Sequence, residues 1–169
     1  MKRLTLLMAA IVVATSLSAQ IGSWRTINVS TCVVSTQATF TKGIQHNRHL
    51  FLGYGTGVDY TTVFNLNLNN IQTGKSESIS VGGLALPIFV DAKLRLFDDW
   101  LSPSVRLRTG ALINTHMPGV GLFATPEVGL DISRYFTLSV GWNGHLLYTP
   151  NYGWYHLTAY PMLGASIRF

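Results

Sequence analysis

The stretch HLTAYPMLGASIRF, residues 156–169, decides the fold expected for this chain. Every second residue from Leu157 to Phe169 is apolar or small, and the intervening positions are mostly polar or small. Alternation with a period of two predicts a β-strand. The strand is longer than those of an ordinary small sheet and one of its faces carries no polar group, so we expect that face to meet lipid rather than protein.

The first residues have the three parts of a secretory signal peptide. Two positive charges precede an apolar run over 4–14, and small residues follow up to Ala19. We expect cleavage after Ala19, so that 1–19 form the signal peptide and 20–169 the mature domain. A transmembrane anchor is the alternative interpretation, but the run is too short to span a hydrocarbon core of about 30 Å comfortably.

The composition also favours a barrel in a membrane. Only 11% of the residues are charged, yet no apolar run after the signal is long enough for a spanning helix. A closed barrel is the other structure that satisfies every backbone group in lipid. The net charge of +5 at pH 7 includes the two charges of the signal and is too small to predict a nucleic-acid partner. Cys32 is the only cysteine, so we expect no disulfide within the chain.

Other segments repeat the alternation, and together they predict an all-β, eight-stranded antiparallel up-and-down barrel. An even number of strands is needed to bring both chain ends to one side, which supports the poorly marked first strand. The expected strands are two within 20–44, with a reversal near 30–32, and then 49–60, 84–97, 103–111, 122–132, 136–148 and 156–169.

The connections between these strands are expected to alternate in length. The segment 61–78 is rich in Asn and Ser and reads as a long loop, although its FNLNLNN sequence could continue the hairpin as strands. The connections at 98–101 and 133–135 are short. This pattern is expected when short turns face the periplasm and longer loops face the outside.

Glycines at 53, 55 and 57 belong to the sequence GYGTG. No helix follows them, so they do not fit a nucleotide-binding motif. Because they alternate as strand positions do, we expect them on the inner face, where they leave room for large side chains opposite.

Charged residues on the inward positions form the candidate site. Pairing of Phe97 with Ser102 would set Asp91 opposite Arg108 and Lys93 opposite Arg106, and pairing of Ile113 with Val120 would set Arg106 opposite Glu127. An eight-stranded barrel is just wide enough for side chains to fill it, and a buried unpaired charge costs several kcal/mol. We therefore predict a salt-bridged plug, with a narrow gate or a small-ligand site as the alternative. The network comprises Asp91, Lys93, Arg95, Arg106, Arg108, Glu127 and Asp131.

Several features together resemble the small eight-stranded outer-membrane barrels of OmpA/OmpX type, and are similar to the outer-membrane β-barrel proteins common in Bacteroidetes. They are the signal ending in Ala19-Gln20, the glycine-rich LFLGYGTGVDY, the strand LPIFVDAKLRLF and the final Ile167-Arg168-Phe169. The resemblance covers essentially the whole mature chain. It implies a monomer in the outer membrane of a Gram-negative cell, and it implies no activity, because fold alone defines none.

The resemblance also implies a role for the last strand. In such barrels a terminal Phe preceded by apolar residues at every second position is read by the outer-membrane assembly machinery. Leu163, Ile167 and Phe169 match that pattern, and Tyr160 would belong to it but lies on the inward face.

Outward aromatic residues are concentrated toward the strand ends and predict the two aromatic girdles of a membrane barrel. Ordinary core residues would not favour the ends of strands on one face. The first girdle would contain Tyr54, Tyr60, Trp142 and Tyr148, and the second Phe40, Trp100, Phe136 and Phe169.

Catalytic and metal sites are not expected. Some barrels of this size modify lipid A with His, Ser and an acidic residue, and Ser139, His145 and Glu127 are the candidates here. Ser139 and His145 lie six residues apart on one strand, about 20 Å, which is too far for a direct dyad. The histidines at 116, 145 and 156 are too scattered to predict a metal site.

We therefore expect a protein without enzymatic activity or cofactor that contacts outer-membrane lipids and has a structural or surface-interaction role. The segment 61–78 is where we expect an unidentified partner to bind. A narrow solute channel is the alternative function, and a lipid-modifying enzyme is a more distant one.

Overall fold

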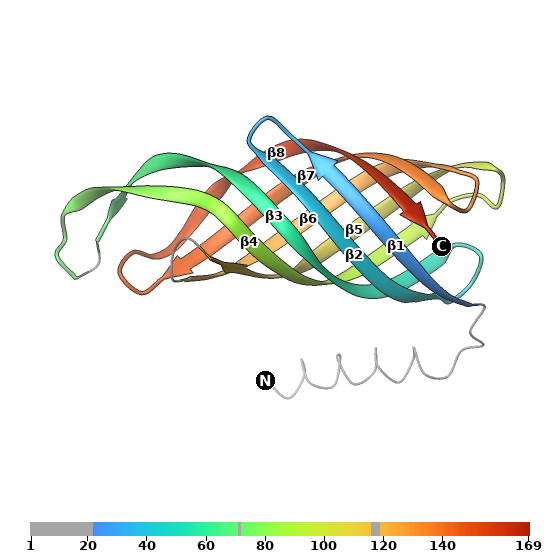
Figure 1. Ribbon diagram of the computed structural model, residues 1–169, viewed down its shortest axis with the longest axis horizontal. Coiled ribbons are helices and arrows are strands. Elements are labelled where there is room, and N and C mark those ends of the chain that lie inside the picture. Colours follow the sequence, from blue (N-terminus) through green and yellow to red (C-terminus); the bar gives the residue numbers. More distant parts are fainter. Residues whose placement is uncertain (1–21, 71, 116–118) are drawn as a thin grey trace.

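The computed structural model is a closed all-β barrel in which each strand pairs antiparallel with its neighbours in chain order (Figure 1). The structure describes residues 22–70, 72–115 and 119–169. Its strands are β1 (Gly22–Thr31), β2 (Ser35–Gln45), β3 (Leu50–Asn69), β4 (Ser76–Arg95), β5 (Leu101–Asn114), β6 (Gly119–Ile132), β7 (Phe136–Thr149) and β8 (Gly153–Arg168).

The predicted fold class and the count of eight strands are confirmed. The first reversal occupies 32–34, close to the predicted position. The expected signal peptide, 1–19, lies outside the described residues. No helix long and apolar enough to cross a membrane occurs in the described part of the chain.

Two ends of the barrel are named here by what they carry. The terminal end holds the start of β1 and the end of β8, together with the connections 46–49, 96–100 and 133–135. The loop end holds the opposite ends of the strands, including the connections 32–34, 70–75 and 150–152 (Figure 1).

The wall has its polar side inward. Buried side chains in the described residues are polar or charged in twenty-four cases and apolar in eight, Pro87 included. β2 shows why, because its Ser, Gln and Thr residues at every second position are buried while the residues between them are exposed. Period-two alternation places the two sets on opposite faces of a strand, so the same sequence pattern builds a polar lumen and an apolar outer wall.

The segment predicted as a long loop is instead a two-stranded extension of the wall, so the loop prediction for 61–78 is wrong. β3 runs to Asn69 and β4 begins at Ser76, with only 70–75 between them. The alternation in FNLNLNN was the correct signal, and the Asn and Ser content that suggested a loop is strand surface. We call residues 62–82 the β3–β4 extension, and Figure 1 shows it projecting past the other strands.

A β-bulge marks the base of this extension. The β3–β4 register shifts between Thr61 and Phe64, and the opposing Gly82 and Gly83 have φ of 112° and 92°. Such backbone angles favour glycine, and a bulge bends the ladder at that point. With connections of similar length at both ends of the barrel, the predicted alternation of short turns and longer loops is also wrong: the asymmetry lies in strand length.

The final strand departs from strict alternation near its start. Its ladder with β7 shifts register between Asn143 and His145, so that Leu157 lies opposite His145. From Tyr160 onward the predicted faces are confirmed, with Met162 and Ser166 buried and Leu163 and Ile167 exposed. The alternation predicted for all of 156–169 therefore holds for its C-terminal part.

The inward glycines of β3 leave room for aromatic rings, as predicted. A Cβ on Gly55 would lie 2.6 Å from Cζ of Phe89, and one on Gly53 would lie 3.0 Å from Cζ of Phe51. Both rings are buried. These glycines let two large side chains fill the lumen without displacing the wall.

Candidate functional site

Charged side chains fill the lumen toward the terminal end. Lys93 Nζ lies 2.7 Å from Asp131 Oδ1, and Arg95 Nε lies 3.6 Å from Asp131 Oδ2. Asp131 also accepts hydrogen bonds from the hydroxyls of Ser104 (2.9 Å) and Thr137 (3.0 Å). Asp131 is only 3% exposed, so these partners, rather than water, neutralise the charge of its carboxylate.

The predicted register of β4, β5 and β6 is confirmed, but the ion pairs within it differ from the prediction. Asp91 lies opposite Arg108, and Arg106 opposite Glu127. The contacts run diagonally instead: Arg106 binds Asp91 through two bonds, of 2.8 and 2.5 Å, and Arg108 binds Glu127. Long side chains reach the diagonal neighbour on the next strand, and a forked guanidinium binds both carboxylate oxygens there.

Arg108 crosses the lumen as well as binding its neighbour. Its Nη1 donates to Gln37 Oε1 at 3.0 Å and to Thr39 Oγ1 at 3.1 Å, and its guanidinium carbon lies 6.0 Å from the centre of the Phe89 ring. Gln37 and Thr39 belong to β2, on the far side of β3 and β4. Arg108 thus ties opposite parts of the wall together.

Apolar side chains fill the lumen toward the loop end. Phe89, Leu112 and Phe123 form a buried cluster, with the rings of Phe89 and Phe123 packed edge to face at 6.0 Å. Each is at most 3% exposed. We call these three residues the apolar cluster.

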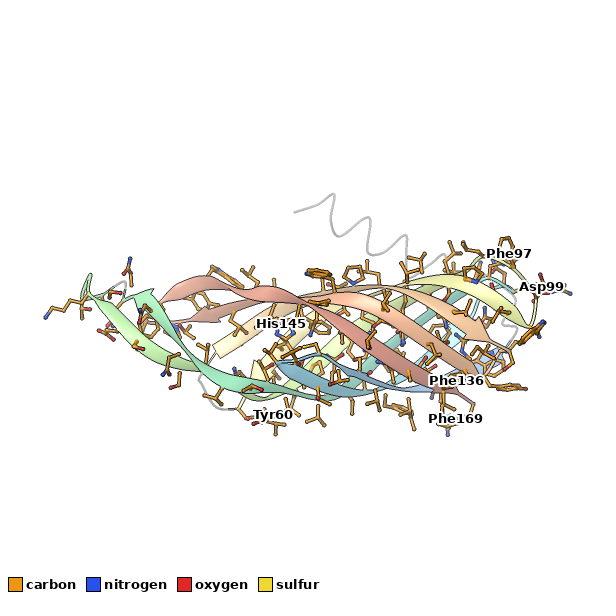
Figure 2. The ribbon with its side chains drawn as sticks, turned by 90° about the horizontal axis from the view of Figure 1, so that it is seen from above. Tyr60, Phe97, Asp99, Phe136, His145 and Phe169 are labelled. Atoms are coloured by element: carbon orange, nitrogen blue, oxygen red, sulfur yellow. The ribbon has the colours of Figure 1, made fainter. Side chains whose placement is uncertain are left out.

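A buried His–Asp pair lies beside this cluster, and the sequence did not predict it. His145 Nε2 is 3.5 Å from Asp59 Oδ2, and the His145 ring packs edge to face on Phe123. Asp59 also accepts hydrogen bonds from Ser35 Oγ (2.9 Å) and Gln37 Nε2 (3.2 Å). Figure 2 shows His145 within the barrel. Its signal in the sequence was an inward Asp and an inward His, on strands too far apart in sequence to be linked.

Of the three residues considered for catalysis, Ser139 and Glu127 meet, but His145 does not join them. Ser139 Oγ donates to Glu127 Oε2 at 3.1 Å, while His145 faces Asp59. A nucleophile and its base need direct hydrogen-bond contact, and Ser139 and His145 bind different carboxylates. The described residues contain no group of three or more His, Cys, Asp or Glu side chains able to hold a metal ion. His116 lies outside the described residues, as does the side chain of His156.

The predicted girdle residues all lie on the outer wall or at its rim, but three of them do not fit the predicted girdles. Tyr60 and Tyr148 lie toward the loop end, whereas Trp142 lies at the middle of β7. Trp100, Phe136 and Phe169 lie at the terminal end. Figure 2 labels Tyr60, Phe136 and Phe169. Phe40 pairs with Thr56 and Lys42 with Tyr54, so Phe40 and Tyr54 are close neighbours and cannot belong to opposite girdles.

An apolar groove crosses the outer wall over β5 to β8. Its volume is about 860 Å³, and Trp142 stands in it between Pro126 and Pro161. The β6–β7 ladder passes from the Ala124–Gly144 pair to the Glu127–Gly141 pair without a pair between them. Pro126 has no N–H to donate, which accounts for part of this interruption.

The predicted assembly residues also lie on the outer wall. Leu163, Ile167 and Phe169 are 65%, 58% and 53% exposed. Ile167 pairs with Ile27 of β1, and Phe169 exchanges two backbone hydrogen bonds of 2.9 Å with Arg25. These residues therefore lie on the seam where the last strand meets the first.

Fold and site together define a closed β-barrel with a charged, hydrogen-bonded lumen and an apolar outer wall. No family model matches this sequence, and no curated protein matches it.

One solved structure is similar, described as the outer-membrane expressed OmpT of Vibrio cholerae. The match has 9% identity and a TM-score of 0.27, and it covers 80% of this chain and 56% of that one. The chain thus spans little more than half the length of that protein, and a likeness this low carries no argument about function.

Proposed function

We propose that this chain is an integral outer-membrane β-barrel protein with a structural or surface-interaction role, of the small monomeric OmpA/OmpX type. The observation that carries the proposal is the reversed polarity of the wall. In the described chain, exposed large apolar residues occur on every strand, while the lumen holds paired charges. Monomeric soluble proteins rarely expose continuous apolar surface on this scale.

Lipid is the environment that fits this surface. A barrel satisfies its backbone hydrogen bonds within the wall, and its outward residues then need only be apolar. Val90, Val128 and Val140, on the outer faces of β4, β6 and β7, are 60%, 59% and 56% exposed. Burial of such side chains in hydrocarbon would stabilise the barrel by roughly 25 cal/mol per Å² of apolar surface removed from water.

The lumen supports a plug rather than a pore. The side chains of Asp91 and Arg108 are fully buried and that of Glu127 is 3% exposed, so water does not reach the middle of the network. We expect no stable conductance steps from purified protein in planar bilayers. Steps that disappear in R106A would overturn the plug and favour the narrow solute channel.

The β3–β4 extension is the surface that we propose for partner binding. Asn65, Asn67 and Ser80 are exposed, and Ser80 Oγ donates to Asn65 Oδ1 at 2.8 Å across the hairpin. Tyr152, in the connection between β7 and β8, donates a hydrogen bond to Glu77 Oε2 at 2.8 Å. This bond links the extension to that connection. This bond to a carboxylate raises the pKa of the Tyr152 phenol.

Membrane insertion and orientation can be tested with two single-cysteine variants in a C32S background. T73C places a thiol in the extension and D99C places one at the terminal end, and both native residues are exposed. We expect a membrane-impermeant maleimide to label T73C on intact cells and D99C only after the outer membrane is permeabilised. Equal labelling of both on intact cells, or recovery of the protein outside the membrane fraction, would contradict the proposal.

Export and assembly complete the proposal. We infer that 1–19 direct export and are cleaved, and that Leu163, Ile167 and Phe169 on the seam are read by the barrel assembly machinery. Replacement of Phe169 by Ser should reduce the folded, heat-modifiable form in the outer membrane several-fold, whereas Leu130→Ser, on the outer face of β6, should reduce it less. Equal effects would argue against a terminal signal.

We propose no catalytic role for the barrel. Overexpression should leave lipid A unchanged by mass spectrometry. A new lipid A species that depends on His145 would instead establish an enzyme.

A further inference from the structure

A cavity at the terminal end of the barrel is lined mainly by arginines. Its volume is about 50 Å³, and its walls are Trp24, Gln45, Arg48, Arg95, Arg134 and Arg168. These residues come from four strands and two turns that converge only because the barrel closes. At roughly 10–15 Å³ for each water-sized group, the cavity has room for one small tetrahedral oxyanion.

The positive charge around this cavity exceeds the negative charge that pairs with it. Arg48 Nη1 and Arg134 Nη2 share one carboxylate, that of Asp98, at 3.0 and 3.2 Å. Arg95 shares Asp131 with Lys93. Within the described chain, two carboxylates therefore serve four cations, before Arg168 is counted.

Arg168 adds a fifth cation whose partners are neutral. Its Nη1 donates to Gln45 Oε1 at 3.2 Å, and its guanidinium carbon lies 5.1 Å from the Phe51 ring centre and 5.8 Å from that of Trp24. No carboxylate of the described chain lies within ion-pair distance of it. The two rings hold the guanidinium at the mouth of the lumen by cation–π contact, with donors left over.

Arg95 lines this cavity on its inner side. Arg95 is 6% exposed, and its Nε has no hydrogen-bond partner in the described structure. That Nε lies 3.6 Å from Asp131 Oδ2, and Nη2 donates to the backbone carbonyl of Asp99. Arg95 therefore contributes a buried positive charge to the cavity wall.

We propose that this cavity binds a small phosphate group, held by the guanidinium groups of Arg48, Arg95, Arg134 and Arg168. Guanidinium forks match the oxygens of phosphate, and the excess of cations matches its double negative charge. The group could be free inorganic phosphate or the headgroup of a phosphomonoester lipid. The inference does not depend on the proposed role of the extension.

The test is calorimetric titration of the detergent-purified protein with inorganic phosphate at low ionic strength, where exposed charges are least screened. We expect one phosphate per chain, bound about tenfold more weakly by R48Q and by R134Q, and beyond detection in the double variant, since each charge-assisted bond contributes on this scale. R25Q is the matched control, because Arg25 is an exposed arginine at the same end that does not line the cavity.

A variant that is expected to bind phosphate more tightly distinguishes an effect on binding from damage to the fold. D98N removes the carboxylate that Arg48 and Arg134 share, so phosphate should bind it about fivefold more tightly than it binds the wild type. A poorly folded protein would not gain affinity. Absence of saturable binding by the wild type, equal weakening in R25Q, or weakening in D98N would overturn the proposal.

Nanodiscs of phosphatidylcholine with and without phosphatidic acid distinguish the two sources once binding of inorganic phosphate is established. A lower apparent affinity for inorganic phosphate in the nanodiscs that contain phosphatidic acid identifies a lipid headgroup as the occupant. Unchanged affinity for inorganic phosphate identifies the free anion, and either result supports the same site.

Discussion

The two halves of the lumen are filled by different chemistry. Toward the terminal end, arginine and lysine side chains extend diagonally or across the barrel to carboxylates and amides, and each contact has a defined donor and acceptor. Toward the loop end, the apolar cluster fills the lumen with rings and a leucine, and the described residues there include the ionisable pair His145 and Asp59.

Charged and apolar side chains in the lumen are therefore stabilised in different ways. A charged contact stabilises only while its partner is present, and removal of one partner leaves an uncompensated charge. An apolar contact has no single partner, so its loss costs in proportion to the surface and the cavity left behind. Substitutions in the terminal half should therefore reduce stability when they change charge. Substitutions in the loop half should reduce it when they change side-chain volume.

The largest effect is expected for Glu127→Gln. Arg108 would keep its bonds to Gln37 and Thr39 but lose its carboxylate, at a cost of about 3–5 kcal/mol. Urea unfolding of the barrel in lipid vesicles measures this cost. The double variant R108M/E127Q should recover much of it, and S139A, which removes only the hydroxyl bond to Glu127, should cost far less. Full stability of E127Q would remove the distinction between the halves.

Leu112→Ala should cost about 2–4 kcal/mol, because Leu112 is 1% exposed within the apolar cluster and its removal leaves a cavity. The same unfolding experiment measures it, and added salt should not change the result. Leu107→Ala on the outer face of the same strand is the control and should cost less. A cost for Leu112→Ala that falls with salt would show that the apolar cluster acts through its charged neighbours.

Asp59→Asn should cost about 1–2 kcal/mol, because the amide keeps one acceptor oxygen for Ser35 or Gln37. A double-mutant cycle with His145→Gln measures the coupling between the two residues, which should be smaller than that of Arg108 with Glu127 because 3.5 Å is at the limit of hydrogen-bond distance. Coupling as large as that of Arg108 with Glu127 would extend the charged chemistry into the loop half.

The smallest effect is expected for Tyr152→Phe. Loss of the bond to Glu77 should speed amide hydrogen exchange in the β3–β4 extension several-fold and leave both halves of the lumen unchanged, because the bond lies outside the barrel wall. Hydrogen exchange followed by mass spectrometry is the measurement. Faster exchange at Phe89 or Arg106 would mean that the extension and the lumen unfold together.

Period-two patterning was sufficient to predict the strands of the barrel wall from β2 onward, most of their faces and even the register of β4 with β5 and β6, because each hairpin fixes its own pairing. The first strand needed the additional argument from an even strand number. It could not predict that Arg106 binds Asp91 rather than Glu127. That choice depends on how long side chains lean across the wall, which residue spacing does not contain.

Contacts across the lumen were beyond prediction for a different reason. Asp59 and His145 lie on β3 and β7, and Arg108 and Gln37 on β5 and β2, so each pair meets only when the barrel closes with a particular stagger. The arginine cavity depends on the same closure. The extension was missed because Asn and Ser favour turns locally, whereas strand pairing overrode that preference.

The seam between β1 and β8 is the ladder with the fewest residue pairs in the described wall. Its ladder has six residue pairs, from Thr26–Arg168 to Thr31–Leu163, whereas the β3–β4 ladder has sixteen. It also joins the strands farthest apart in sequence, so its closure carries the largest loop entropy and we expect it to form last. Until that step the wall is an open curved sheet. It closes when β8, with Phe169 after its last residue, pairs with β1.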